Sequence, residues 1–331
     1  MLIKPKFVQN FNKMAYTRAV IDLGTNTFQL LVGSCEDAGA PLRIYANLQR
    51  PVQLGKGAME TGIIQEDAIE RAQVVLKEFI QIAASHGCEV GDMTALATSI
   101  LRNASNGEEI LSRWRQMFGI QVELISGIRE AELLFEGVFH SLPKPWDRPT
   151  LLMDIGGGSV EFILFQGPEV LYKTSLELGG LKLRSLFNRA DFFDLSIKES
   201  CTQYIDEHLQ PLFAACGNLP QVLVGAAGAF ETMWDIEQAL RGGSPIGSAH
   251  VLDLPCFYRV KEEIEGLQAD ERTSYPGMRA FRAGIFPYAN LLVDSVLSHF
   301  GIEEMWMSGS SLKEGYWFYQ RAEAIKKGII F

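Results

Sequence analysis

The sequence predicts a mixed α/β protein made of two similar domains. Three observations support this fold class: an Asp followed by a glycine-rich turn occurs twice, strand-like and helix-like segments alternate in both halves, and prolines gather between the halves. At 331 residues, the chain has the length of two ordinary domains. We expect an N-terminal extension over residues 1–16, a first domain over 17–142 and a second domain over 150–311. The last helix, within 312–331, is expected to pack back on the first domain.

The repeated turns are Asp22–Thr27 and Asp154–Ser159, which lie 132 residues apart. Each lies between two apolar runs, so each copy predicts a strand, a turn and a second strand. A turn of Gly, Thr, Asn and Ser presents backbone N–H groups and hydroxyls with little side-chain bulk, which suits phosphate oxygens. One such turn alone fits a tight hairpin better, whereas two with the same leading Asp indicate two surfaces that face one phosphate-rich ligand. The predicted phosphate contacts are Gly24, Thr25, Asn26, Thr27, Gly156, Gly157, Gly158 and Ser159.

The other elements follow from hydrophobic periodicity and from Gly and Pro breakers. Pro143, Pro145 and Pro149 mark the predicted linker, after which the strand–turn–strand pattern restarts. Residues 97–106 begin as an apolar strand and end in polar residues. Further strands, some with their loops, are expected at 42–56, 93–98, 122–125, 222–224 and 305–307. Helices are expected at 67–85, 106–118, 130–140, 181–189, 196–215, 226–240, 255–266, 279–299 and 311–327.

Composition narrows the class of protein. The formal net charge of −10 argues against broad nucleic-acid binding, and no apolar run reaches the roughly 18 residues of a membrane span. The five cysteines are scattered and lack metal-ligand spacing, which predicts reduced, buried thiols and a cytoplasmic location. The N-terminus has no signal-peptide pattern; translation from Met14 would also fit, so whether residues 1–13 are native stays open.

The two copies differ at one position. Aligning Asp22 with Asp154 puts Gln29 opposite Glu161, so only the second copy carries two carboxylates. A turn between them would bring both to one point, and carboxylates beside a phosphate suit Mg²⁺ or another divalent cation. We therefore predict Asp154 and Glu161 as metal ligands, with Asp22 holding a metal-bound water. The same spacing also fits Glu161 as an exposed strand residue.

Two further segments carry candidate residues. Arg102, at the expected end of a strand, is placed to bind a phosphate with its guanidinium, although it equally fits a surface arginine before a helix that is capped by Ser105 or Asn106. Residues 125–132 join a strand to a helix that Ser126 can cap. On the residues alone, Glu130 in the first turn of that helix fits a favourable interaction with the helix dipole better than catalysis.

Taken in order, these segments resemble the exopolyphosphatase/guanosine pentaphosphate phosphatase (Ppx/GppA) family of the actin-like ATPase and sugar-kinase superfamily. The resemblance covers roughly residues 17–318 and is to the short, two-domain form. The similar stretches are residues 21–32, 97–106, 125–138, 153–162, 176–183, 224–233, 277–293 and 308–315.

The resemblance implies two ribonuclease-H-like domains with a cleft between them and removal of a terminal phosphate with Mg²⁺ or another divalent cation. It implies that Glu130 is the catalytic glutamate and that Arg102 faces phosphate. It also implies that Asp154 and Glu161 organise metal and water. Gly228 matches a substrate-binding loop in which the family usually has Gly-Thr; Ala229 removes that hydroxyl.

Several alternatives stay open at this point. A kinase of the same superfamily acting on an acid or a sugar, or a non-catalytic nucleotide sensor, fits the same turns. Polyphosphate and guanosine pentaphosphate end in the same phosphoanhydride, and no feature decides between a monomer and a homodimer. A long polyanion would need a basic track, for which the candidates are Arg43, Arg50, Lys56, Lys182 and Arg184.

Overall fold

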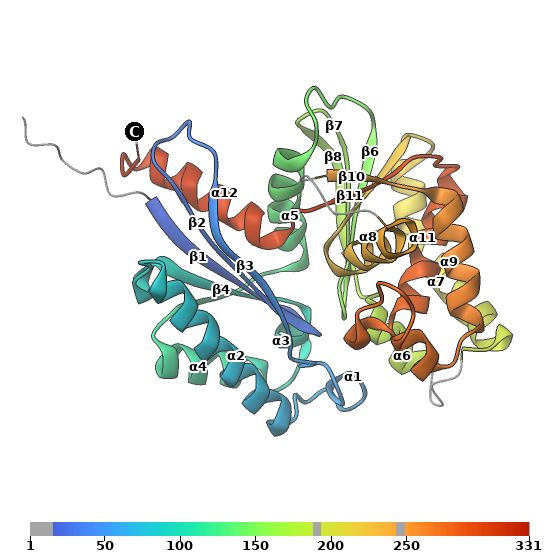
Figure 1. Ribbon diagram of the computed structural model, residues 1–331, viewed down its shortest axis with the longest axis horizontal. Helices are drawn as coiled ribbons and strands as arrows, with labels where there is room; N and C mark the ends of the chain where they lie inside the picture. The colour runs from blue at the N-terminus through green and yellow to red at the C-terminus, as the bar shows by residue number, and fades with distance from the viewer. Residues whose placement is uncertain (1–15, 188–192, 243–248, 331) are drawn as a thin grey trace, which may run out of the picture.

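The computed structural model describes residues 16–187, 193–242 and 249–330, which form two α/β halves (Figure 1). The expected N-terminal extension lies, apart from Tyr16, outside the described residues, as do residues 188–189 of the helix expected at 181–189.

The first half is built on a five-stranded sheet with the strand order β3-β2-β1-β4-β5. β1 pairs antiparallel with β2 and β2 with β3, whereas β4 and β5 continue the sheet in parallel from β1. The strands are β1 (Tyr16–Leu23), β2 (Thr27–Cys35), β3 (Arg43–Pro51), β4 (Met93–Ala97) and β5 (Gln121–Leu124).

The second half is built on a six-stranded sheet with the order β10-β11-β9-β6-β7-β8. Across the sheet from β8 to β11, the strand pairs repeat the pattern of the first sheet. The pairs β8–β7 and β7–β6 are antiparallel, and the pairs β6–β9 and β9–β11 are parallel. The repeated turn joins β1 to β2 in one sheet and β6 to β7 in the other. The strands are β6 (Thr150–Ile155), β7 (Val160–Gln166), β8 (Glu169–Leu176), β9 (Val222–Ala226), β10 (Ala249–Leu252) and β11 (Met305–Ser308).

Helices cover both faces of each sheet because successive side chains of a strand point to opposite faces. Ile21 on β1 packs among the buried side chains of α2 (Glu66–Ser85) and α4 (Gly107–Phe118). Val20, its neighbour, packs instead with α5 (Gly127–Ser141) and α12 (Leu312–Lys326). On the second sheet, one face packs against α7 (Leu195–Cys216) and α11 (Phe286–Phe300).

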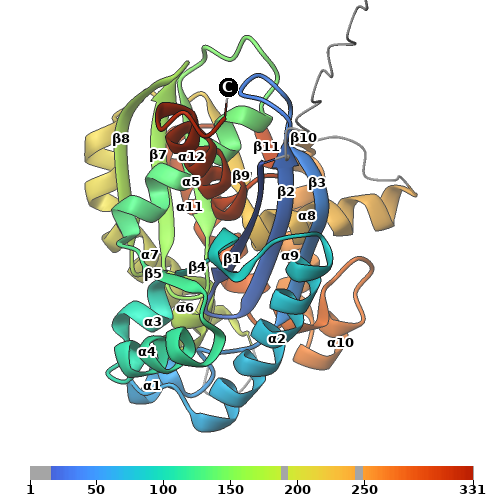
Figure 2. The ribbon, with the colours of Figure 1, turned by 90° about the vertical axis from the view of Figure 1, so that its left-hand side faces the viewer.

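Helix α5 contributes to both halves. Leu133 lies in the apolar cluster with β1, β2 and α12, whereas Leu134 and Val138 lie in the cluster with β6, β7 and β9. In both views α12, coloured red, lies beside α5 (Figure 1, Figure 2). The boundary at residues 143–149 stays a prediction.

Several elements differ from the sequence-based expectation. Residues 99–103 form the short helix α3 (Ser99–Asn103) instead of continuing a strand. The helix expected at 279–299 begins only at Phe286, because Gly284 interrupts the segment and Pro287 favours the first turn of a new helix. Strands β8 and β10 are additional edge strands, and they lack the continuous apolar run that identifies a buried strand.

The remaining elements are α1 (Ala58–Thr61), η1 (Val90–Asp92), α6 (Gly180–Phe187), α8 (Ala227–Arg241), α9 (Leu254–Gly266), α10 (Ala269–Thr273) and η2 (Ala280–Arg282).

All five cysteines are free and buried. Within the described ranges, no helix combines the length and the apolar character that crossing a membrane requires.

Candidate active site

The two glycine-rich turns close hairpins with the same register. Asp22 on β1 lies opposite Gln29 on β2, and Asp154 on β6 lies opposite Glu161 on β7. Residues directly opposite in an antiparallel pair project from the same face of the sheet. The second hairpin therefore places two carboxylates side by side, whereas the first places one carboxylate beside an amide.

Carbonyl oxygens of both turns are hydrogen-bonded to a neighbouring segment. In the second turn, the Gly157 carbonyl accepts hydrogen bonds of 3.0 Å from the N–H groups of residues 181–182, in the first turn of α6. In the first turn, the Asn26 carbonyl accepts hydrogen bonds of 3.0 and 2.8 Å from the N–H groups of residues 52–53. Since these carbonyls are already engaged, the turns have mainly N–H groups and hydroxyls to offer an anion.

Glycine is required where the turns approach each other. A Cβ at Gly157 would lie 2.8 Å from the Cβ of Thr25, and a Cβ at Gly158 would lie 2.3 Å from the Oγ of Ser99. Both distances are too short for any larger residue. The turns of the two halves are thus in direct contact.

A cavity of about 70 Å³ lies between the turns, and every predicted site residue except Arg102 lines it. A second cavity of about 520 Å³ adjoins it at Asn26 and Ile285. The predicted residues that line the smaller cavity are Asp22, Gly24, Thr25, Asn26, Thr27, Glu130, Asp154, Gly156, Gly157, Gly158, Ser159, Glu161 and Gly228.

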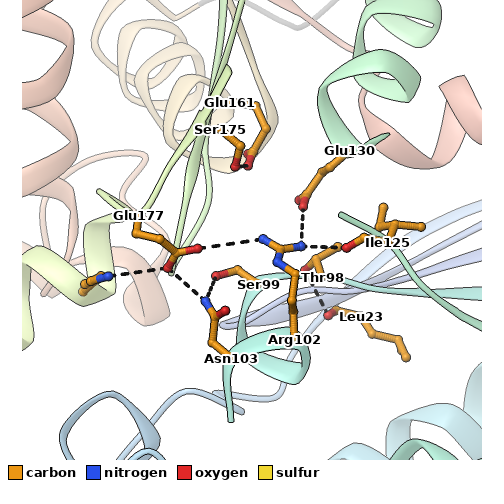
Figure 3. A network of polar contacts seen from close by, with 11 residues as sticks. Leu23, Thr98, Ser99, Arg102, Asn103, Ile125, Glu130, Glu161, Ser175 and Glu177 are labelled. Atoms are coloured by element: carbon orange, nitrogen blue, oxygen red, sulfur yellow. Dashed lines mark hydrogen bonds and ion pairs between the residues drawn. The ribbon is translucent and has the colours of Figure 1, made fainter. Parts of the chain in front are cut away.

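Glu130 enters this cavity from the first turn of α5. The Ser126 hydroxyl caps that helix by accepting a hydrogen bond of 3.2 Å from the Arg129 N–H. The Glu130 carboxylate lies 3.5 Å from the Nη1 of Arg102, which also donates a 2.8 Å hydrogen bond to the Ile125 carbonyl (Figure 3). Arg102 thereby joins the site through Glu130.

The expected surroundings of Arg102 need correction. Arg102 lies on α3, one helical turn after β4, and not at the end of the strand. Asn106 precedes α4 as one of the two expected N-caps, but its side chain does not cap that helix. It bonds instead to the N–H and carbonyl of Ile64, at 3.0 and 2.9 Å.

Burial and mutual repulsion raise the pKa of the acids that line the cavity. Burial first, and then the charges of Glu161 and Asp22, hold the pKa of Glu130 well above its usual value. The same causes raise the pKa of Asp154. Burial raises the pKa of Asp22 to about 7, with the nearby Lys313 ammonium acting in the opposite direction. Glu161 also has a raised pKa, chiefly from burial, although it accepts a 2.7 Å hydrogen bond from the Ser175 hydroxyl.

These acids fit a divalent cation that is shared with a bound phosphate. One carboxylate oxygen of Asp22 is buried without a hydrogen-bond partner, and Asp154 and Glu161 lie directly opposite each other. Across the described part of the chain, no three acidic, His or Cys side chains converge closely enough to enclose a metal ion. The paired carboxylates suit Mg²⁺, which takes one or two carboxylates and completes its coordination with water and phosphate oxygens.

This region also contains two basic residues that no local sequence pattern indicated. Arg282 is only 7% exposed, lines the cavity, and has a buried Nε without a hydrogen-bond partner among the described residues. Its guanidinium lies against Gly228, where a Cβ would be 1.6 Å from Nη2. Lys313, 3% exposed, donates a 3.1 Å hydrogen bond to the Oε1 of Gln29. Both residues lie in stretches that resemble the Ppx/GppA family, and this resemblance is the one sequence feature that could have indicated them.

The candidates for the basic track lie on different elements, with different partners. Arg50 forms an ion pair of 2.7 Å with Glu78 on α2. Lys56 and Arg184 line the larger cavity. Lys182 lies 3.5 Å from the Oε2 of Glu177. The basic track itself stays a prediction.

Known proteins with similar sequences and structures agree with this architecture. The model of the Ppx/GppA phosphatase family matches residues 34–323. A solved structure of an exopolyphosphatase from Cytophaga hutchinsonii is 34% identical, with a TM-score of 0.87, over 93% of this chain and 98% of that one. A Ppx/GppA family member from Aquifex aeolicus is 25% identical, with a TM-score of 0.75, over 94% of this chain and 98% of that one. The predicted fold class, two ribonuclease-H-like domains of the actin-like ATPase type, is confirmed.

Proposed function

This chain belongs to the Ppx/GppA phosphatase family and is a hydrolase of phosphoanhydrides, and we propose that it removes the terminal phosphate from inorganic polyphosphate, from guanosine pentaphosphate, or from both. The observation that carries this proposal is the cavity in which Glu130 meets Asp154, Glu161 and both glycine-rich turns. The similar structure from Cytophaga hutchinsonii is an exopolyphosphatase, which supports polyphosphate as a substrate.

The turns and the arginines would hold the phosphates. N–H groups and hydroxyls of residues 24–27 and 156–159 would bind the oxygens of the last two phosphates. Arg102 and Arg282 would balance part of their charge, since a guanidinium can donate two parallel hydrogen bonds to a phosphate. The low exposure of Arg282 strengthens such a contact because little water competes for it.

Glu130 would accept the proton of the attacking water. Attack forms a bond from the water oxygen to the terminal phosphorus, and the bond to the bridging oxygen breaks. A carboxylate with a raised pKa is a stronger base once it is ionised, which suits proton transfer near neutral pH. Arg102, 3.5 Å away, holds Glu130 in place.

Asp154 and Glu161 would hold a divalent cation, with Asp22 reaching it through water. When bound, Mg²⁺ supplies positive charge that stabilises the phosphate oxygens during the transfer. The raised pKa values of these acids indicate that the site favours added positive charge, whether it comes from protons or from a cation.

The catalytic role of Glu130 is tested by Glu130→Gln. We expect phosphate release to fall about 10²- to 10⁴-fold, because general-base assistance is worth that much, with an unchanged melting temperature. Glu132→Gln is the matched control: Glu132 lies on the same helix, is bonded to Lys173 and Arg129, and does not line the cavity. Activity of Glu130→Gln within a few-fold of wild type would remove Glu130 from this role.

The substrate is tested by Mg²⁺-dependent phosphate release from long polyphosphate, guanosine pentaphosphate and ATP, measured side by side without an acceptor. Release from either of the first two supports a phosphatase and separates the two substrates. A strict need for ATP and an acceptor would instead indicate a kinase. We also propose a cytoplasmic location, which the five free, buried thiols support.

A further inference from the structure

Glu177 reaches across the edge of the active site toward residues that the proposed function assigns to phosphate binding. We propose that Glu177 determines affinity for phosphate anions: its carboxylate competes with substrate and product phosphate for the guanidinium of Arg102, which lies beside the cavity and contacts Glu130. The inference rests on the proposed phosphate-binding role of Arg102.

The position of Glu177 follows from the chain around it. It comes directly after β8 and before the glycine pair that leads into α6. From this second-half position, its Oε2 accepts a hydrogen bond of 3.0 Å from the amide of Asn103, on α3 of the first half. The same oxygen lies 3.5 Å from the Nζ of Lys182, and its Oε1 lies 3.9 Å from the Nη2 of Arg102 (Figure 3).

The two amino groups of Arg102 have different partners. Nη1 is engaged by the Ile125 carbonyl and by Glu130. Nη2 has the Glu177 carboxylate at the longer distance of 3.9 Å, and it is therefore the group more easily given to a phosphate oxygen. A phosphate that binds there meets the Glu177 carboxylate, which occupies the same donors and carries the same sign of charge.

Exposure allows Glu177 to be displaced. Its side chain is 43% exposed, compared with 20% for Arg102 and 13% for Glu130. An ion pair that is this exposed and this long contributes little stability. Glu177 is thus poorly suited to hold the two halves together, and it can turn to solvent when a phosphate arrives. When product phosphate leaves, the carboxylate returns to the donors.

This competition predicts that removing the charge of Glu177 strengthens phosphate binding. The test is Glu177→Gln, which keeps an oxygen for Asn103 and loses the negative charge. We expect the dissociation constant of inorganic phosphate, measured by calorimetry, to fall about threefold to tenfold. The inhibition constant of phosphate during turnover and the KM should fall with it, because the same donors bind substrate and product.

Glu132→Gln is the matched control, because Glu132 is also a partly exposed acid, at 37%, but it is bonded to Lys173 and Arg129 outside the cavity. It removes the same charge and should leave phosphate affinity unchanged. Glu177→Asp has a shorter side chain but keeps the charge, so it should bind phosphate nearly as weakly as the wild type.

Arg102→Ala separates failure of this inference from failure of its premise. If Arg102→Ala weakens phosphate binding while Glu177→Gln leaves it unchanged or weaker, Glu177 is no competitor and the proposed function stands. If Arg102→Ala has no effect on phosphate affinity, the assumed phosphate site is wrong and the inference is overturned with it. The double variant Arg102→Ala/Glu177→Gln should bind phosphate no more tightly than Arg102→Ala alone, because Glu177 then has no guanidinium to compete for.

Discussion

The two hairpins of this protein share a backbone and differ in how their acids are balanced. In the first, Gln29 stands opposite Asp22 and accepts a hydrogen bond from the buried Lys313. In the second, Glu161 stands opposite Asp154 and accepts its 2.7 Å hydrogen bond from the neutral Ser175 hydroxyl. The first hairpin has the Lys313 ammonium bonded to its amide, whereas the two carboxylates of the second have only the more distant guanidinium groups of Arg102 and Arg282.

This difference explains how one hairpin backbone supports both direct phosphate binding and metal-dependent phosphate binding. A turn that carries a single carboxylate can bind phosphate through its N–H groups without needing a metal. A turn with two acids side by side repels bare phosphate and attracts it once a divalent cation is present. The asymmetry arises from one position in each β-hairpin and from one lysine near the end of the chain.

The largest expected effect comes from making the second hairpin resemble the first. Glu161→Gln removes one of the two paired carboxylates, and we expect phosphate release to fall about 10²-fold or more, since a bound metal ion contributes several kcal/mol to transition-state stabilisation. The Mg²⁺ concentration needed for half-maximal activity should rise. Glu169→Gln, at the exposed start of β8, is the control. An unchanged Mg²⁺ requirement would show that the two hairpins are equivalent in metal binding.

Removing the internal counter-ion should come next. Lys313→Met leaves the buried Glu314, 3.1 Å from the ammonium in the wild type, without its charged partner. We expect a loss of about 3 kcal/mol in the free energy of unfolding, measured by denaturant titration. Lys326→Met on the same helix removes a lysine that is 72% exposed and should change stability little. Equal stabilities of these two variants would contradict the assigned role of Lys313.

The pH dependence of stability sharpens the comparison further. In metal-free protein, Asp22 has a folded-state pKa of about 7 against an ordinary 3.8. The folded state therefore holds a proton that the unfolded chain has lost between these values, so this stabilisation is complete below about pH 4 and is lost as the pH rises through about 7. We expect Asp22 alone to lower the free energy of unfolding in chelator by ~2 kcal/mol between pH 5.5 and 7.5, with the raised pKa values of Glu130, Asp154 and Glu161 adding to the fall. Asp22→Asn should reduce the fall by that amount, and a fall that the substitution leaves unchanged would assign the effect to the other acids.

The smallest effect is expected from the reciprocal change in the first hairpin. Gln29→Glu places a second carboxylate opposite Asp22, but Lys313 lies 3.1 Å from that side chain and would pair with it. We expect activity within about threefold of wild type and stability within about 1 kcal/mol, since the introduced charge finds a partner. A gain in Mg²⁺ affinity comparable to the loss in Glu161→Gln would mean that Lys313 does not balance this hairpin.

The sequence predicted those structural elements whose defining residues lie close together in the chain. The hairpins could be predicted because Asp, the glycine-rich turn and the flanking apolar runs lie within about a dozen residues of each other. Helix α3 could not, because five residues are too few to show helical periodicity, and Arg102 was accordingly expected at the end of a strand. Lys313 escaped notice because its contact with Gln29 spans 284 residues, which no local pattern encodes.

The placement of α5 in two apolar clusters has a mechanical consequence. A rotation of one half against the other must slide this helix over one of the two sheets, because Leu133 is held by the first and Leu134 by the second. Glu130, in the first turn of the same helix, moves with it. If α5 stayed on the first sheet, such a rotation would move Glu130 away from the paired acids of β6 and β7; if it stayed on the second sheet, that distance would be kept.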